Sequence, residues 1–510
     1  MALYIPPEIL AEIFMDAVDT NGITDRNPTV AMSLSAVCST WRSVALSASA
    51  IWARISARIN LLGPDYVDYP AGLLPRLELH LARSRSELLD LTLQIDNWVP
   101  EDEQRVIDHL SANVIDAREP LLLLKAILSE SHRTKRISLL TDETFSLHYL
   151  QALSILRLFP WGNMQSVELK LPFGVNSRDE TIELIEVFGI SNPNLCHLWF
   201  SDTPGSFPNR LSDAFPSSQI THLRVGHTFN RRSILCLSHF TGLISARFGV
   251  SRDEDDEGSE NEEQTHLVLP HLRSLTLDIR EGYSRPEADL TTTSIIHDAL
   301  TLPSLEHLAY TCAAAKIVSN YDPESGSSIF VNSLLHMLAR SSSSISSFHL
   351  EGIPIKDAEI LPLLKQMPLL EELELREASR STQQQSPHGD FGRDVMATSQ
   401  LLEALTLTSN KDQLLPRLRR IILWTYTHWK NGPTLEAFLE SRIGGQSGSK
   451  NRPLESAYLH LVDEHQDAKW TFDQRRLKAV QEGGIAVKLV QHFDQDNLDS
   501  DTRKILFGYE

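Results

Sequence analysis

Residues 368–375 read Pro-Leu-Leu-Glu-Glu-Leu-Glu-Leu, and this stretch decides the fold that we predict. Leu373 and Leu375 alternate with glutamates, as expected for a short strand with one buried face. Leu370 lies three residues before Leu373, and Pro368 lies two residues before Leu370. Along the chain, an apolar helical stretch and a turn precede such segments, so the unit that we predict is helix, turn and strand.

The same pattern recurs through most of the chain. Further copies that keep the proline begin at Pro193, Pro270, Pro303 and Pro416. With 41% apolar residues and 25 prolines, chance predicts about two such matches, so the five copies are an excess. Weaker copies begin at Leu88, Met164, Ile220, Leu243, Ile345 and Leu454, and partial copies lie at Ile137 and Val487. Successive predicted strands are roughly 23 to 47 residues apart.

Repeated helix-strand units at this spacing favour a solenoid. The pattern resembles irregular leucine-rich repeats, which implies an α/β fold with a parallel sheet on the concave side and helices on the convex side. We predict this solenoid over residues 61–510. Three segments break the pattern, at 252–263, 379–393 and 444–453, and their acidic or Gly/Ser-rich composition predicts disordered insertions.

Composition limits the possible partners and compartments. The formal net charge of −20 argues against a nucleic-acid partner. The four cysteines, at positions 38, 196, 236 and 312, lie too far apart for a zinc motif, and a disulfide framework is not expected. No run approaches the roughly 18 apolar residues that suggest a membrane span. These observations predict a cytoplasmic or nuclear protein, or one found in both compartments, with no membrane association.

Sequence motifs of known catalytic chemistry are missing. The chain has no phosphate-binding glycine loop, no dinucleotide fingerprint and no zinc-protease helix motif. His460 and His465 are five residues apart and would not share a helix face, so we predict no metal site there. We therefore expect no catalytic residue, no cofactor and no enzyme activity, although distant residues could still assemble a site.

The first sixty residues have a different pattern, and we predict a helical domain over residues 1–60. Pro7 and the acidic residues after it favour a helix from Pro7 to Val18. Its apolar residues form two stripes, Ile9 with Ile13 and Leu10 with Phe14 and Ala17, which is wider than one internal contact needs. A polar loop at 19–27, a second helix over Val30–Val44 and a short third helix with Ile51, Trp52 and Ile55 complete the prediction.

The segment Ile5-Pro6-Pro7-Glu8-Ile9-Leu10, followed by Ile13-Phe14, Val37-Cys38, Trp41-Arg42 and Trp52, resembles an F-box, as in fungal proteins that carry leucine-rich repeats after it. It departs from the usual F-box pattern at Ile5, where leucine is common, and in its longer loop. The resemblance implies a substrate receptor of an SCF-type ubiquitin ligase. A Skp-type adaptor would join it to a cullin scaffold, and other subunits would perform catalysis. The adaptor contacts that it implies are Ile5, Pro6, Pro7, Ile9, Leu10, Ile13, Phe14, Val37, Cys38, Trp41 and Trp52.

Other readings of the same residues stay open. The helices could cap the solenoid without binding an adaptor, and the chain could be a scaffold that binds partners without promoting ubiquitination. Any of the implied contacts could instead be internal core, above all Val37 and Trp41. The protein substrate cannot be named from the sequence.

Period-two alternation predicts which side chains a target protein would meet. The residues between the buried positions of each strand should face the concave side. The candidate substrate-binding residues are Trp199, Arg224, Arg376, Trp424, Tyr458 and His460. Large aromatic side chains of this kind are frequent in binding hot spots. For Trp424 the alternative is packing within the protein, because a register error of one residue would turn it inward.

Overall fold

The computed structural model describes residues 5–18, 21–23, 27–60, 72–96, 119–141, 159–170, 192–200, 217–229, 237–250, 266–279, 290–312, 323–353, 355–377, 399–407, 413–425, 432–443, 454–461, 474–482 and 484–490. The three insertions predicted at 252–263, 379–393 and 444–453 lie outside these residues. The fold is α/β. Its 15-stranded sheet is open, with β1 and β17 at its two ends, and the strands follow one another in chain order. The chain divides into two compact units, residues 1–249 and 250–510.

Unit 1 contains the N-terminal helices and the first strands. The helices are α1 (Pro7–Ala17), α2 (Val30–Ala36), α3 (Ser39–Ser47), α4 (Leu73–Ser84) and α6 (Glu119–Ser129), with single 3-10 turns η1 (Ser49–Trp52), η3 (Ser131–Arg133), η4 (Ser217–Gln219) and η5 (Leu237–His239). The strands are β1 (Asn21–Ile23), β2 (Arg54–Asn60), β3 (Leu89–Asp96), β4 (Thr134–Thr141), β5 (Ser166–Lys170), β6 (His197–Phe200), β7 (His222–Phe229) and β8 (Ser245–Val250). The pairs from β1 to β7 are parallel.

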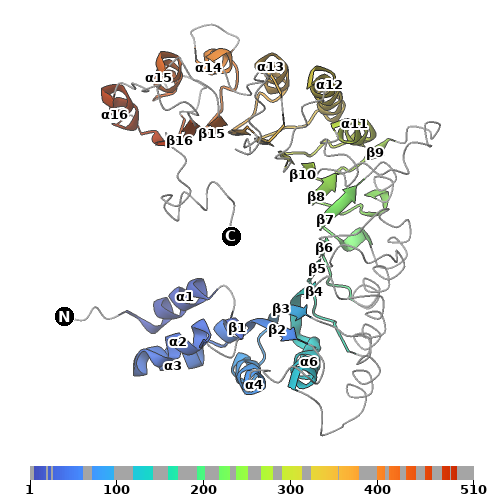
Figure 1. Cartoon of the computed structure of the whole chain (residues 1–510), viewed down its shortest axis with the longest axis vertical. Helices are drawn as coiled ribbons and strands as arrows, with labels where there is room; N and C mark the ends of the chain where they lie inside the picture. Colours follow the sequence, from blue (N-terminus) through green and yellow to red (C-terminus); the bar gives the residue numbers. More distant parts are fainter. Residues whose placement is uncertain are drawn as a thin grey trace, which may run out of the picture. The chain divides into compact units, whose positions relative to one another are not determined.

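Unit 2 alternates strands and helices in the residues that the structure describes. Its sheet strands are β10 (Ser274–Ile279), β12 (His307–Cys312), β13 (Ser347–Glu351), β14 (Glu372–Arg376), β15 (Arg420–Thr425), β16 (Ser456–Leu461) and β17 (Ala486–Val490), and its helices are α11 (Leu290–Ala299), α12 (Pro323–Ser341), α13 (Asp357–Lys365), α14 (Ser399–Leu405), α15 (Gly432–Ser441) and α16 (Gln474–Glu482). These helices lie side by side along one face of the strands (Figure 1). A separate two-stranded sheet pairs β9 (Leu267–Val268) with β11 (Leu300–Thr301).

Alternating burial along the strands agrees with the predicted pattern. Leu373 and Leu375 on β14 are each 1% exposed, and Leu370 before them is fully buried. Their neighbours in register, on β13 and β15, are also buried: Phe348, Leu350, Ile421 and Leu423. The proline-marked copies in both units bury their apolar positions in the same way. In unit 2 the helices cover this apolar face (Figure 1), and in both units we call the face opposite the buried apolar side chains the open face. It carries His197, Trp199, His222 and Arg224 in unit 1 and His349, Glu374, Arg376, Trp424 and Tyr458 in unit 2.

Three predictions for the first sixty residues are wrong. The helix expected over Val30–Val44 is two helices, because Cys38 is extended (φ −158°, ψ 174°) and begins a new helix at Ser39. The third helix is the single turn Ser49–Trp52, and Ile55 lies instead on strand β2, in register with Leu91. The expected polar loop contains strand β1, which also joins the sheet.

Hydrogen bonds of the Asn21 side chain explain why the chain joins the sheet already at β1. The side-chain amide of Asn21 donates to the carbonyls of Ile51 (2.6 Å) and Arg54 (3.0 Å), and its oxygen accepts from Ala31 N–H (3.1 Å). Asn21 is fully buried, so these bonds satisfy a polar group that would otherwise be costly to bury. They fasten α2 and η1 to the first two strands.

Candidate functional site

The first candidate site is the N-terminal helical cluster, which consists of α1, α2, α3 and η1. Helix α1 begins at Pro7, and Glu8 lies in its first turn, where a negative charge complements the helix dipole. Its two apolar stripes have different environments. Leu10 and Phe14 are buried, whereas Ile9 and Ile13 are 48% and 46% exposed. Ile5, two residues before the start of α1, is 43% exposed.

The buried stripe builds the core of this cluster. The rings of Phe14 and Trp41 lie 5.0 Å apart, and Leu10 packs in the same core. Trp52 is fully buried and donates its indole N–H to the carbonyl of Ala45 at 2.7 Å. Ala17, which we expected on this stripe, is exposed, and Val18 is buried instead.

The implied adaptor contacts therefore divide by environment. Seven are exposed (Ile5, Pro6, Pro7, Ile9, Ile13, Val37 and Cys38), Trp41 is half-buried, and three are core (Leu10, Phe14 and Trp52). Val37, at 61%, has the largest exposed fraction among the exposed large apolar residues described, and it lies at the break between α2 and α3. The Sγ of Cys38 accepts from Trp41 N–H at 3.5 Å and caps α3. The structure thus offers an apolar surface on α1 and at this break.

A contact between the helical cluster and α4 holds the cluster in place. His80 of α4 is fully buried, and its Nε2 lies 2.9 Å from the hydroxyl of Thr29, the N-cap residue of α2. Its ring also packs against Trp52, with centroids 4.9 Å apart. Burial lowers the pKa of His80 to about 4, so the side chain is neutral at physiological pH.

The second candidate site is the open face, and in unit 1 it centres on Trp199. The Cζ of Arg224 lies 3.9 Å from the centre of the indole ring, and the Nζ of Lys170 lies 4.6 Å from it. Lys170 also forms an ion pair with Glu168 at 2.8 Å. Trp199 and Arg224 are register neighbours on β6 and β7, so two of the predicted substrate-binding residues meet here. Burial lowers the pKa of His197 and of His222 on the same face, and the charges of His222 and Arg136 add to the effect at His197.

In unit 2 the open face carries a charged cluster. His349 contacts Glu351 through Nε2 at 3.2 Å and Glu374 through Nδ1 at 2.9 Å, and Arg376 pairs with Glu374. Burial by itself would lower the pKa of His349, but the two carboxylates outweigh it and raise the pKa to about 9. The histidine is therefore a cation at neutral pH.

The remaining substrate-binding candidates lie on neighbouring strands of unit 2. Arg376, Trp424 and His460 share one register row across β14, β15 and β16. The Cζ of Arg376 is 5.7 Å from the Trp424 ring, but Trp424 is only 8% exposed. The alternation of side chains along β15 puts Trp424 on the open face, but its side chain is too buried to be reached by a partner protein.

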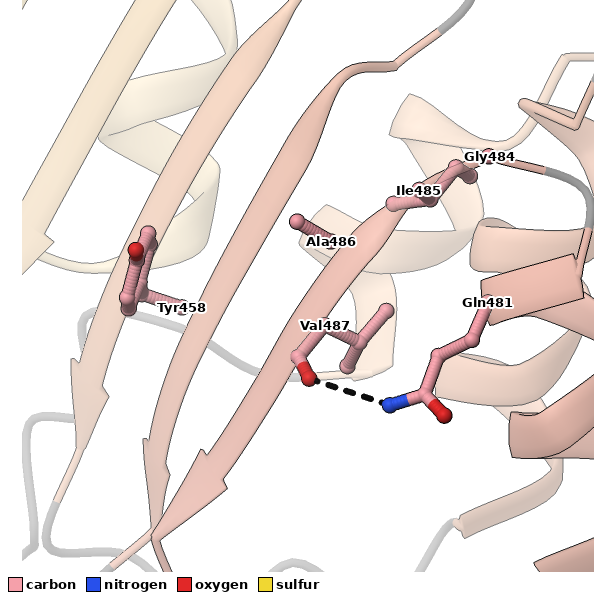
Figure 2. Close-up of a pocket in the computed structure, with 6 residues that line it drawn as sticks. All are labelled: Tyr458, Gln481, Gly484, Ile485, Ala486 and Val487. Carbon is pink, nitrogen blue, oxygen red and sulfur yellow. Dashed lines mark hydrogen bonds between the residues drawn. The ribbon is translucent and has the colours of Figure 1, made fainter. Parts of the chain in front are cut away.

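Tyr458 is half-buried and lines a cavity of about 430 Å³, which sequence reasoning did not find. Figure 2 shows the other lining residues, Gln481 on α16 and residues 484–487 at the start of β17. The amide of Gln481 donates to the carbonyl of Val487 at 3.3 Å. The cavity has no titratable group other than the tyrosine hydroxyl, so it offers contact area and no acid-base chemistry.

The described ranges contain no group of three or more His, Cys, Asp or Glu side chains that could hold a metal ion. Among the helices described, none combines the length and apolar character needed to cross a bilayer. No protein-family model matches the chain, and no curated protein is significantly similar to it.

Proposed function

We propose that the chain is the substrate-recognition subunit of an SCF-type ubiquitin ligase. In this proposal the helical cluster is an F-box that binds a Skp-type adaptor and, through it, a cullin scaffold. The sheet with its helices is an irregular leucine-rich-repeat solenoid that binds the target protein. The protein itself is not an enzyme, and it acts in the cytoplasm, the nucleus or both.

The observation that carries the proposal is the exposure of Ile5, Ile9 and Ile13. Ile9 and Ile13 are four positions apart and lie one above the other on α1, and Ile5 lies in the extended segment just before the helix. Single exposed apolar residues are common on protein surfaces, but three on one short segment indicate an interaction surface. The core of the cluster does not need them, because Leu10 and Phe14 already fill it. Covering each isoleucine on binding would contribute about 1.5–3 kcal/mol at most.

The open face is the proposed surface for the target protein. Parallel strands in chain order place one side chain of each repeat beside the next, which gives a continuous row of contacts. Trp199 with Arg224 in unit 1 and Tyr458 in unit 2 are the aromatic and arginine anchors that binding surfaces favour.

The test is capture of a purified Skp-type adaptor by the full-length chain. The double variant Ile9→Glu/Ile13→Glu places two carboxylates on the proposed contact and should lose adaptor binding. Met15→Glu is the matched control. Met15 is also exposed on α1, but it is two residues from Ile13 and so does not share its stripe. Leu10 and Phe14 are unsuitable for the test because they are core.

Three results are informative. Adaptor capture that is lost only in the double variant supports the proposal. No adaptor binding by the wild-type chain, or equal binding by all three proteins, contradicts it. Adaptor binding without adaptor-dependent ubiquitination of any captured protein identifies a scaffold instead of a substrate receptor.

A further inference from the structure

Trp199 on the open face of unit 1 lies between two cations from the strands that flank it. Lys170 on β5 and Arg224 on β7 both lie over its indole ring, at 4.6 Å and 3.9 Å from the ring centre. The face of an aromatic ring attracts cations, and two cations already use that attraction here. A basic side chain of a partner protein would therefore be repelled at this point.

A third cation, Arg247 on β8, lies beside Arg224. The backbone N–H groups of Ile244 and Ser245 both donate to the carbonyl of Thr221. This bonding sets Arg247 next to Arg224 across the two strands, and the alternating burial along β8 turns Arg247 to the open face. Neighbouring strands are about 4.8 Å apart, so the two guanidinium groups lie side by side.

The charges around these side chains leave an excess of positive charge. On the described strands from β5 to β8, Glu168 supplies the negative charge of the open face, and it pairs with Lys170 at 2.8 Å. The charges of Arg224 and Arg247 are therefore in excess over the acidic residues of these strands. The histidines of β6 and β7 add no positive charge at neutral pH, because burial lowers their pKa. We call the following four residues the Trp199 cluster: Lys170, Trp199, Arg224 and Arg247.

We propose that the Trp199 cluster binds an acidic segment of the target protein, with aspartate or glutamate carboxylates as the ligands. This inference rests on the proposed receptor function, because it states the chemistry of the target. Arginine suits the role, since its planar fork can donate two parallel hydrogen bonds to one carboxylate. The net charge of −20 on the whole chain does not prevent binding, because charges more than about 8 Å away are largely screened at physiological salt.

The spread of the cations favours a run of carboxylates over a nucleic acid. Strands β5 and β8 are three strand spacings apart in the sheet, or about 14 Å. An extended peptide rises about 3.3 Å per residue, so about four acidic residues in a row would cross the cluster. A nucleic acid would carry its phosphates well beyond the cluster, where the remainder of an acidic protein would repel them.

Binding of a fluorescein-labelled peptide to the full-length chain, followed by fluorescence anisotropy, tests the site. The probe is a glutamate-rich peptide that spans about 14 Å when extended, and the control probe has glutamine at every glutamate. We expect Arg224→Gln and Arg247→Gln each to weaken binding of the acidic peptide about tenfold. Raising the ionic strength from about 0.01 M to about 0.15 M, which shortens the Debye length from about 30 Å to about 8 Å, should also weaken it.

The matched control is Arg420→Gln. Arg420 also lies on the open face, on β15 in unit 2, but its register neighbours are Glu372 and Ser456, so it does not belong to a row of cations. This variant should bind the acidic peptide as wild type does. Melting temperatures are compared first, and Arg247→Gln alone decides the result if Arg224→Gln does not fold.

Equal affinity for the acidic and the glutamine peptide would overturn the proposal, and so would equal losses in the Arg247→Gln and Arg420→Gln variants. Tighter binding of a single-stranded oligonucleotide of the same charge would also overturn it and would identify a nucleic-acid site. Adaptor capture by the same proteins separates the two proposals. Adaptor capture without binding of the acidic peptide contradicts only this inference, whereas peptide binding by a chain that captures no adaptor supports the site and contradicts the receptor function.

Discussion

Arg442 donates two hydrogen bonds to the carbonyl oxygen of Leu405, from Nε at 3.2 Å and from Nη2 at 2.5 Å. Leu405 is the last residue of α14, and the final carbonyls of a helix have no partner inside it. The same guanidinium donates to the carbonyls of Leu415 (2.8 Å) and Leu414 (3.1 Å), just before β15. An arginine at the end of α15 therefore holds both the end of the preceding helix and the turn that leads to the next strand.

The same arrangement recurs in other repeats. Arg340, near the end of α12, donates to the carbonyls of His297 (2.6 Å) and Leu300 (3.2 Å) at the end of α11. In unit 1, Arg133 follows α6 and donates to the carbonyl of Leu81 in the last turn of α4 at 3.1 Å. A cation at a helix C-terminus also complements the helix dipole. Each arginine thus links two helices of the fold.

Arg442→Met should destabilise the protein strongly. The variant keeps the apolar stem but removes the donor to the carbonyls of Leu405 and Leu414 and one of the two donors to that of Leu415, which should cost roughly 2–5 kcal/mol. Arg442→Lys should recover only part of this loss, since an ammonium group cannot match the planar fork of arginine. The measurement is the urea midpoint followed by circular dichroism.

The control for this prediction is Arg419→Met. Arg419 has two ion pairs, with Glu455 and Glu371, but its side chain is partly exposed to solvent. Surface pairs of this kind contribute little, so the control should shift the midpoint much less. Equal shifts for Arg442→Met and Arg419→Met would show that the capping bonds do not stabilise the fold.

The strands of the sheet from β3 onward could be predicted from the sequence because each carries its own signal, whereas β1 and β2 were expected to be loop and helix. Leu373 and Leu375 alternate with charged residues, and burial on one face follows from that alternation. The break at Cys38 could not be predicted, because apolar residues continue at helical spacing on both sides of it. A side-chain cap, and not hydrophobic periodicity, ends one helix and begins the next there.

The sites were less predictable than the strands. Sequence showed two apolar stripes on α1, but only packing against Trp41 decides that Phe14 is core and Ile13 is surface. The stacking of His197 on His222 could not be predicted, since it depends on the register between β6 and β7, which sequence periodicity does not specify. In both cases the arrangement depends on packing or strand register between residues far apart in the sequence, which a local sequence pattern does not determine.

His349 should make stability fall as the pH rises above neutrality. Its pKa is about 9 in the folded protein, above the value of about 6.5 in an unfolded chain. The ion pairs that His349 forms with Glu351 and Glu374 therefore stabilise the fold fully below pH 6.5, and this stabilisation is lost as the pH rises through 9. Between pH 6.5 and 9, the free energy of unfolding of wild type should fall by about 1–3 kcal/mol relative to that of His349→Gln. A stability difference that stays constant over this range would contradict the assignment.

His297 should produce the opposite pH dependence. It is fully buried, with Tyr310 Oη 2.7 Å from Nε2 and Ser333 Oγ 2.9 Å from Nδ1. Burial, with a smaller effect from Arg340, lowers its pKa to about 3. The neutral ring stabilises the fold above pH 6.5, and this contribution is lost as the pH falls toward 3.

The variant His297→Gln separates this effect from general acid unfolding. Glutamine keeps one donor and one acceptor for Ser333 and Tyr310 but cannot titrate. Between pH 6.5 and 4.5 the stability advantage of wild type over this variant should shrink by about 2 kcal/mol. The stability advantage of wild type over the variant His80→Gln should also shrink as the pH falls, because burial lowers the pKa of His80 to about 4. An advantage that grows in acid would show that the imidazole is charged in the fold.

Trp424 and Trp199 both lie on the open face but should respond differently to truncation. Trp424 is 8% exposed, so Trp424→Ala should create a cavity and cost about 3 kcal/mol or more. Trp199 is only half-buried, with Lys170 and Arg224 over its ring, so Trp199→Ala should leave the melting temperature nearly unchanged. In the proposed receptor, Trp199→Ala should instead reduce capture of a target protein, by about 2 kcal/mol if it is a hot spot. If Trp424→Ala is no more destabilising than Trp199→Ala, Trp424 is a surface residue and becomes a candidate target contact again.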